Sequence, residues 1–301
     1  MFATGDLFVT AAERLTIALA GGLGLILVAE RHHLRRLTGR TLFLRWRTWA
    51  ITAPLYGAAA MGPTVFALLF ISAIAAQGIR EYAALTKLPR HYRLSLYVAG
   101  LLSAPVLLSS ITVWRAMPPI LLLAATVPAL LRQDVRSGAR DLAYAALGFA
   151  YIPWLLAYFL LIQRHIDGGR GILIALGTSV AVSDVCAFCL GKGFGRHKLA
   201  PALSPNKTWE GAAGNLVGAL GGFALMSFAL PGGLNPLVAW SLPIVVAAGC
   251  IWGDLVESLI KRQFGVKDAG TCLPGFGGVL DRIDSLLVVL PLAYTLLTLT
   301  A

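Results

Sequence analysis

Long apolar runs, separated by short polar connections, recur along almost the whole chain. Hydrophobic residues make up 57% of the 301 residues, charged residues only 13%, and the mean hydropathy is +0.77. A helix that crosses a lipid bilayer needs about 20 mostly apolar residues, and many of the runs approach this length. The sequence therefore predicts an all-α, polytopic integral membrane protein and argues against a soluble domain.

We expect about ten transmembrane helices in this chain. The second and the third are short, and only Gly62-Pro63 divides them. No linker is long enough to separate soluble domains. The predicted spans cover roughly residues 12–29, 47–61, 63–78, 94–112, 116–131, 142–163, 171–190, 212–230, 235–253 and 283–300.

Basic residues are unevenly divided between the two ends of these spans. With the N-terminus outside, every Lys and Arg except Arg14, Arg115, Arg164 and Arg170 falls on the inner side. Because Lys and Arg favour cytoplasmic ends, this bias supports an even number of spans in the inner (plasma) membrane. The net charge of +11 favours membrane lipids with anionic headgroups and phosphate substrates as partners. No nucleic-acid motif is present, so we expect no nucleic-acid partner.

Carboxylates gather near the inner ends of the later spans. Asp184 stands inside an apolar run, where a lone carboxylate that faces lipid would be strongly disfavoured. Two groups of polar residues further on have the spacing of one helix face, and together with Asp184 they could converge on a hard cation. Ordinary salt pairing, or capping of a broken helix by Asp184, would explain the same pattern. The two groups are Asp254, Glu257, Ser258 and Lys261, and Asp281, Asp284 and Ser285.

The loop "GKGFGRHKLAPALSPNKTWEG", residues 191–211, combines glycines with four basic residues. Pro205 favours an extended conformation at Ser204, and we expect residues 206–208 to open the next helix. Free amides at a helix start bind phosphate well. The loop is therefore a candidate phosphate site, although a flexible basic loop on the inner side would look similar.

Two stretches resemble one enzyme family. "SPNKTWEG" and, some fifty residues later, "GDLVESLIKRQFGVKDAGTCLPGFGGVLDRIDS" resemble the phosphatidate cytidylyltransferase (CDP-diacylglycerol synthase) family, and "SDVCAFCLGKGFG" is similar to a further segment of it. The resemblance extends over about residues 45–300. It implies a membrane-embedded cytidylyltransferase domain at 47–301, preceded by an added transmembrane helix and basic cytoplasmic loop at 1–46. One position departs, because Phe276 stands where the family usually has histidine.

The resemblance also implies three sets of site residues. A metal ion would be held by Asp184, Asp254, Asp281 and Asp284. Catalysis would involve Lys261, Arg262, Lys267, Asp268 and Arg282. Substrate would be bound by Ser204, Asn206, Lys207, Thr208, Glu210, Ser258, Gly277 and Gly278.

The reaction implied by the resemblance transfers CMP from CTP to phosphatidic acid, giving CDP-diacylglycerol and pyrophosphate. Mg²⁺ is the expected cofactor, with a second cation such as K⁺ and a homodimer left open. The site would face the cytoplasm. Three other functions stay open: a CTP-dependent kinase of isoprenoid alcohols, a paralogue that uses another lipid phosphate, and a membrane transporter.

Overall fold

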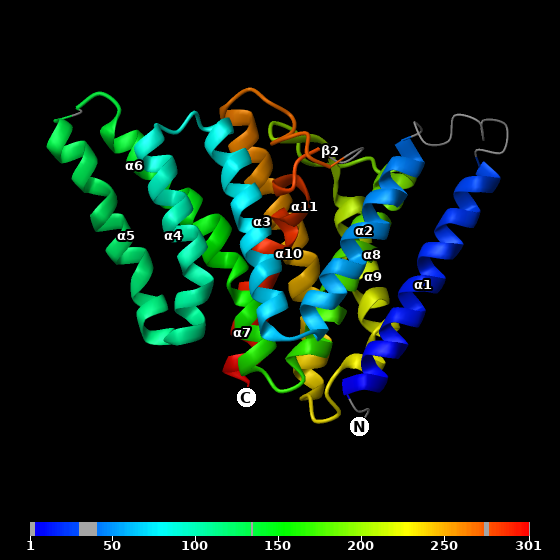
Figure 1. Ribbon diagram of the computed structural model, residues 1–301. Coiled ribbons are helices and arrows are strands. Elements are labelled where there is room, and N and C mark those ends of the chain that lie inside the picture. Colours follow the sequence, from blue (N-terminus) through cyan, green and yellow to red (C-terminus); the bar gives the residue numbers. More distant parts are fainter. Residues whose placement is uncertain (1–3, 30–40, 134, 274–276, 301) are drawn as a thin grey trace.

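The structure is a computed structural model that describes residues 4–29, 41–133, 135–273 and 277–300. These residues form a bundle of helices that run alongside one another (Figure 1). Helix α1 begins and α11 ends at the lower end of the bundle in this view. The α-helices are α1 (Thr4–Ala29), α2 (Thr41–Met61), α3 (Thr64–Leu85), α4 (Arg90–Ser109), α5 (Ile111–Arg132), α6 (Gly138–Phe149), α7 (Tyr158–His165), α8 (Gly169–Phe194), α9 (Trp209–Leu225), α10 (Pro236–Gln263) and α11 (Leu280–Leu299).

The predicted spans all fall on helical segments. The short second and third spans are separate helices, because α2 ends at Met61 and Pro63 caps the start of α3. A π-helical turn, η2 (Ala150–Trp154), joins α6 to α7, so that the two helices form one helical stretch, Gly138–His165. Within the described residues, seven helical stretches are long and apolar enough to cross a membrane. The chain is thus a polytopic membrane protein, and the number of ten crossings stays a prediction.

A short β-hairpin interrupts the helices at the upper end of the bundle (Figure 1). Strands β1 (Lys198–Ala200) and β2 (Ser204–Thr208) pair antiparallel, with Ala200 opposite Ser204. The prediction that residues 206–208 open the next helix holds only for Thr208, which is the N-cap of α9, because Asn206 and Lys207 continue the extended conformation of β2. Helix α9 begins directly after Thr208, whose side chain caps it by accepting a hydrogen bond from the Gly211 N–H at 3.1 Å.

Helices α8 and α9 pack with their backbones in close contact. A Cβ atom on Gly218 would lie 2.6 Å from the Ser183 Cα of α8, and Gly222 is equally constrained against Ser179. The same holds between α10 and α11, where Gly253 faces the Asp284 carbonyl. Small residues at such interfaces are typical of membrane bundles, because they let helices approach closely. This packing fixes the four helices that carry the predicted carboxylates.

Helix α1 lies at the edge of the bundle beside α2 (Figure 1). The Trp46 side chain of α2 donates a hydrogen bond to the Leu19 carbonyl of α1 at 2.9 Å. Arg14 donates to the Leu225 carbonyl at the end of α9, and its guanidinium lies 4.1 Å from the Phe228 ring centroid. The helix is therefore docked on the bundle by specific contacts. Most of the predicted basic loop that follows it, residues 30–40, lies outside the described residues.

Candidate functional site

A cavity of about 300 Å³ lies where α8, α9, α10 and α11 meet the β-hairpin. It gathers all four aspartates predicted to bind metal, together with four of the residues predicted to bind or transform substrate. Two further polar residues, Asn215 and Ser285, also line it. The predicted site residues on its wall are Asp184, Asn206, Lys207, Thr208, Asp254, Asp281, Arg282 and Asp284.

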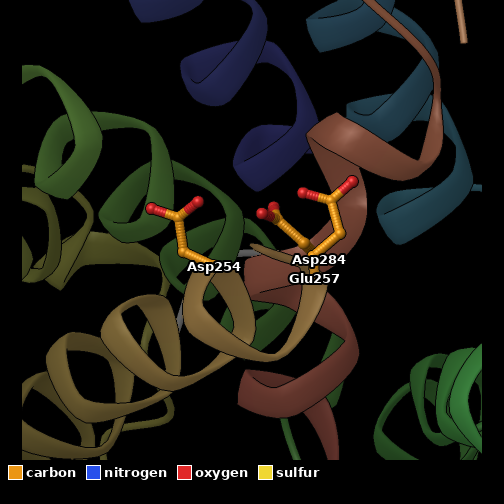
Figure 2. Close-up of side chains that lie close together, drawn as sticks. All are labelled: Asp254, Glu257 and Asp284. Atoms are coloured by element: carbon orange, nitrogen blue, oxygen red, sulfur yellow. The ribbon is translucent and has the colours of Figure 1, made fainter. Parts of the chain in front are cut away.

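Three carboxylates point toward one another beside this cavity (Figure 2). Asp254 and Glu257 come from α10 and Asp284 from α11, and ligand atoms of all three lie within 4.8 Å of one another. Glu257 is almost fully buried, and its Oε1 has no hydrogen-bond partner among the described residues. Asp284 is also buried, whereas Asp254 is partly exposed. Carboxylates this close repel one another unless a cation compensates them, and burial strengthens the repulsion. The oxygen-only donor set suits a hard divalent cation such as Mg²⁺.

Glu257 was not among the predicted metal ligands. The helical spacing of Asp254 and Glu257 was visible in the sequence, but i,i+4 pairing with Lys261 explained it equally well. The structure contains both interactions, because the Lys261 Nζ lies 2.6 Å from Glu257 Oε2 while Oε1 is left unpartnered. The spacing of these residues in the sequence is therefore compatible with both roles of Glu257, as the ion-pair partner of Lys261 and as a metal ligand.

Lys261 joins two carboxylates rather than lining the cavity. Its Nζ also lies 2.7 Å from Asp281 Oδ1, and all three side chains are buried. The other oxygen of Asp281 accepts hydrogen bonds from the backbone N–H groups of Ala269 at 3.0 Å and Gly278 at 2.8 Å. Asp281 thus reaches the cavity wall while both of its oxygens are held by the protein.

Positive charge reaches the cavity from two other elements. Lys207 of β2 forms an ion pair with Asp254, so the hairpin is tied to the carboxylate group of α10. Arg282 of α11 lines the cavity and is exposed. Cations of this kind, next to carboxylates that can hold a metal, are suited to binding the phosphates of a nucleotide.

The remaining predicted residues lie off the cavity wall. Arg262 donates to the carbonyls of Leu203 and Val266, both at 3.1 Å, and so holds the turn of the hairpin. Lys267 and Asp268 are exposed on the connection between α10 and α11. The predicted residues not found on the wall are Ser204, Glu210, Ser258, Lys261, Arg262, Lys267, Asp268, Gly277 and Gly278.

Glu210, predicted to bind substrate, instead holds the hairpin to α9. Its carboxylate accepts a hydrogen bond from His197 Nδ1 at 2.8 Å. Hydrogen bonds from its own backbone N–H and from His197 lower the pKa of Glu210 to about 2. The side chain is therefore an anion at all physiological pH values, with its partners on the hairpin.

The connection between α10 and α11 forms a tight loop. Leu273 and Gly277 exchange two backbone hydrogen bonds, at 2.8 and 3.1 Å. Gly277 has a φ of +90°, a conformation that disfavours any side chain. Phe276, whose replacement of the family histidine left substrate preference open, lies outside the described residues together with Pro274 and Gly275.

A second residue missed from the sequence is Glu81 of α3. It is buried, and its carboxylate accepts hydrogen bonds from the backbone at the start of α11. A single glutamate near the inner end of a span gives no sign of such a contact, since its partners lie almost 200 residues away and are backbone groups. Only the packing of α3 against α11 discloses it.

Comparison with known proteins agrees with this geometry. The sequence profile of the cytidylyltransferase family matches residues 43–300. Phosphatidate cytidylyltransferase of Mycobacterium leprae is 40% identical over 171 residues, 57% of this chain and 54% of the relative. The enzymes of the same name from Staphylococcus haemolyticus and Brucella suis are 41% and 40% identical over 157 and 154 residues, covering 52% and 50% of this chain and 59% and 56% of the relatives.

The matched stretches span a little over half the length of each of these relatives. The family profile, in contrast, covers most of this chain and includes every element that lines the cavity. The resemblance first read from the C-terminal motif is thereby confirmed, and the chain belongs to the cytidylyltransferase family.

Proposed function

We propose that this protein transfers the cytidylyl group of CTP to phosphatidic acid, giving CDP-diacylglycerol and pyrophosphate. The observation that carries the proposal is the cavity in which Asp184, Asp254 and Asp284 meet Lys207 and Arg282. The named relatives support it, because each is a phosphatidate cytidylyltransferase. A nucleotidyl transfer between two phosphates needs such a combination of anionic ligands for metal and cations for phosphate.

Asp254, Glu257 and Asp284 would hold Mg²⁺, with Asp184 on the same cavity wall. The unpartnered Glu257 Oε1 supports this assignment, since a buried carboxylate oxygen without a donor is costly. Bound Mg²⁺ would neutralise the charge of the phosphate oxygens and favour attack on phosphorus. A second cation such as K⁺ stays an expectation.

The chemical step needs little acid–base chemistry. A phosphate oxygen of phosphatidic acid forms a bond to the α-phosphorus of CTP, the bond from that phosphorus to the bridging oxygen breaks, and its electron pair leaves with pyrophosphate. The attacking phosphate is already an anion near neutral pH, so no base must deprotonate it. Lys207 and Arg282 would hold the phosphates in line, and Asn206 and Thr208 would orient them, so that catalysis rests on positioning and charge neutralisation.

The site would face the cytoplasm from the inner membrane. The hairpin and the α10–α11 connection lie at the same end of the bundle as the α3–α4 and α5–α6 connections (Figure 1). These are the connections on which Lys and Arg concentrate, and Lys and Arg favour the cytoplasmic side. CTP is made and kept in the cytoplasm, so this orientation gives the cavity access to both substrates.

Labelled CTP tests the proposal. Purified protein in mixed micelles with phosphatidic acid and Mg²⁺ should move an α-phosphate label from CTP into the lipid. The pyrophosphate that it releases should carry no label. The Asp254→Asn variant should lose this transfer by about 100-fold or more, because a ligand for the metal is lost. The Asp167→Asn variant, changed on the exposed α7–α8 connection, should match the wild type.

Other outcomes would overturn the proposal. Transfer of the γ-label to an isoprenoid alcohol would identify a kinase instead. Label transfer to another lipid phosphate, but not to phosphatidic acid, would identify a paralogue with a different acceptor. Transport of a solute into proteoliposomes, with no label entering lipid, would identify a transporter.

A further inference from the structure

The α10–α11 connection, residues 264–279, carries much of the family motif, and its described residues, 264–273 and 277–279, form no helix or strand apart from the isolated Leu273–Gly277 bridge. Of its predicted site residues, Lys267 and Asp268 are exposed, and Gly277 and Gly278 have no side chains with which to anchor it. The Leu273–Gly277 hydrogen bonds close a turn within the connection but do not attach it to the bundle. Phe264 packs edge-on against Tyr144 of α6, with ring centroids 5.5 Å apart, and further support comes from groups outside the connection.

Glu81 of α3 supplies one such group. Its Oε1 accepts a hydrogen bond from the Val279 N–H at 3.0 Å, and its Oε2 accepts one from the Leu280 N–H at 2.8 Å. Gln77, one turn earlier on α3, donates to Oε1 at 2.7 Å and orients the carboxylate. The first N–H groups of a helix lack partners within the helix, and the helix dipole favours an anion there. Glu81 thus caps α11 from another helix.

The connection is shaped to admit this carboxylate. A Cβ atom on Gly278 would lie 2.5 Å from Glu81 Oε2, and a Cβ atom on Gly270 would lie 2.8 Å from Oε1. A side chain at either position would push the Glu81 carboxylate aside. The carboxylate therefore touches the connection at two positions that are eight residues apart in the sequence, in addition to the start of α11.

Asp281 holds the same connection from the other side. It accepts hydrogen bonds from the backbone N–H groups of Ala269 and Gly278. Ala269 precedes Gly270, and Gly270 and Gly278 are the two positions that meet Glu81. Asp281 belongs to α11, whose start Glu81 caps, and Asp284 of the carboxylate group follows one turn later. A shift of Glu81 would consequently displace both the connection and the carboxylates of α11.

Glu81 is 5% exposed, and no basic side chain in the described part of the chain forms an ion pair with it. Its charge is compensated by backbone N–H groups and by Gln77. A neutral amide of the same shape could accept only one of the two backbone hydrogen bonds with its oxygen, and its NH₂ group would face the other N–H donor. The role thus depends on the carboxylate and not on its volume.

We propose that Glu81 is a positioning residue, which caps α11 and clamps the α10–α11 connection next to it, so that the α11 carboxylates Asp281 and Asp284 keep their places on the cavity wall. It does not line the cavity itself. The inference deepens the proposed function, and it rests on that function only for its activity readout.

Cys272 provides a direct probe, because it is exposed on the connection. With Cys186 and Cys189 changed to serine and Cys250 left buried, a nitroxide label on Cys272 reports the mobility of the connection by electron paramagnetic resonance. The comparison uses the full-length protein with Glu81, Glu81→Gln or Glu81→Asp. Asp141→Asn is the matched control, because Asp141 is an equally buried carboxylate on α6 that pairs with Arg140.

Glu81→Gln should increase the mobility of the label and lower kcat by about 10-fold or more, as expected for loss of a supporting residue. Asp141→Asn should leave the label spectrum as it is. If Glu81→Gln does not fold, Gly278→Ala tests the same contact from the other side, since its methyl group would displace the Glu81 carboxylate. An unchanged spectrum in the folded variant would overturn the inference, even if its activity fell.

Because the label spectrum needs neither CTP nor lipid, it separates two failures. Increased mobility without any cytidylyl transfer by the wild type would support the clamp and contradict the proposed function. Normal transfer by the wild type, with a label in Glu81→Gln that is no more mobile than in the wild type, would support the proposed function and contradict the clamp.

Discussion

At the scale of single residues, the site is organised around buried charge. Lys261 lies between Glu257 and Asp281, and Glu257 turns its other oxygen toward Asp254 and Asp284. Lys261 therefore compensates two of the acids and Lys207 a third, Asp254, while the negative charge that remains in the carboxylate group favours a bound cation. This explains how so many acids can be buried at one place in an apolar protein.

Lys261→Met should strongly destabilise the protein. Removing the cation leaves Glu257 and Asp281 buried without their partner, which costs about 3–5 kcal/mol. The apparent melting temperature in detergent should fall clearly, while Lys267→Met, at an exposed position on the adjoining connection, should leave it unchanged. Equal melting temperatures for the two variants would contradict the bridging role and favour a purely substrate-binding lysine.

Glu257→Gln should weaken metal binding. The change removes a charged oxygen from the group that includes Asp254 and Asp284, so Mn²⁺ used as a spectroscopic substitute should bind less tightly. Activity should fall by about 100-fold or more. Asp167→Asn, on the exposed α7–α8 connection, is the control. Mn²⁺ binding that is unaffected by Glu257→Gln would remove this residue from the ligand set.

The sequence was sufficient to predict the acids that stand in apolar surroundings. The cost of an isolated carboxylate singled out Asp184, helix spacing suggested that Asp254, Asp281 and Asp284 could converge with it, and the family resemblance implied all four as metal ligands. The structure places the four on one cavity wall, and their binding of a metal stays a prediction. The division of labour among them could not be predicted. Which oxygen faces a lysine, a backbone N–H or the cavity depends on side-chain directions across α10 and α11, and helical spacing alone does not determine these directions.

At the scale of secondary-structure elements, hydropathy located the helices but not their ends. Helix α10 continues to Gln263, about ten residues beyond the predicted span, and this polar extension carries Asp254, Glu257 and Lys261. Hydropathy measures only the part of a helix inside the hydrocarbon layer. The chemistry lies in the turns beyond it, where a helix persists after its sequence has become polar.

The close contact between α8 and α9 gives a matched pair of variants. Gly218→Ala places a methyl group against the Ser183 backbone, next to Asp184, and should cost about 1–3 kcal/mol and lower activity. Gly221→Ala, one turn away on the same helix, has open space around the new methyl group and should be neutral or slightly stabilising. Melting temperatures and transfer rates of the two proteins check this, and identical results would contradict the packing.

At the scale of the whole molecule, the hairpin and the α10–α11 connection lie at one end of the bundle (Figure 1). Residues of the hairpin also line the cavity. The N-terminal end of α1 and the C-terminal end of α11 lie at the other end, as an even number of crossings requires. This arrangement agrees with the charge bias in the sequence, although the bias itself could not place the cavity. The predicted homodimer stays a prediction.

Thiol labelling of cells can test the orientation. A membrane-impermeant maleimide should reach Cys272 from the cytoplasmic side only, and a cysteine placed by Asp167→Cys on the α7–α8 connection should react from the outside only. Inverted membrane vesicles and intact spheroplasts supply the two sides. Labelling of Cys272 in intact spheroplasts would contradict the proposed orientation.

The backbone contacts of α8 with α9 and of α10 with α11 have a mechanical consequence. Where no side chain separates two helices, no change of rotamer can absorb a displacement, so α8 and α9 must move together, and so must α10 and α11. Asp254 and Glu257 lie on α10 and Asp284 lies on α11, so all three belong to one such pair. Thinning or thickening of the bilayer should therefore leave the spacing of these three carboxylates unchanged, which would keep the turnover rate steady while the composition of the membrane varies.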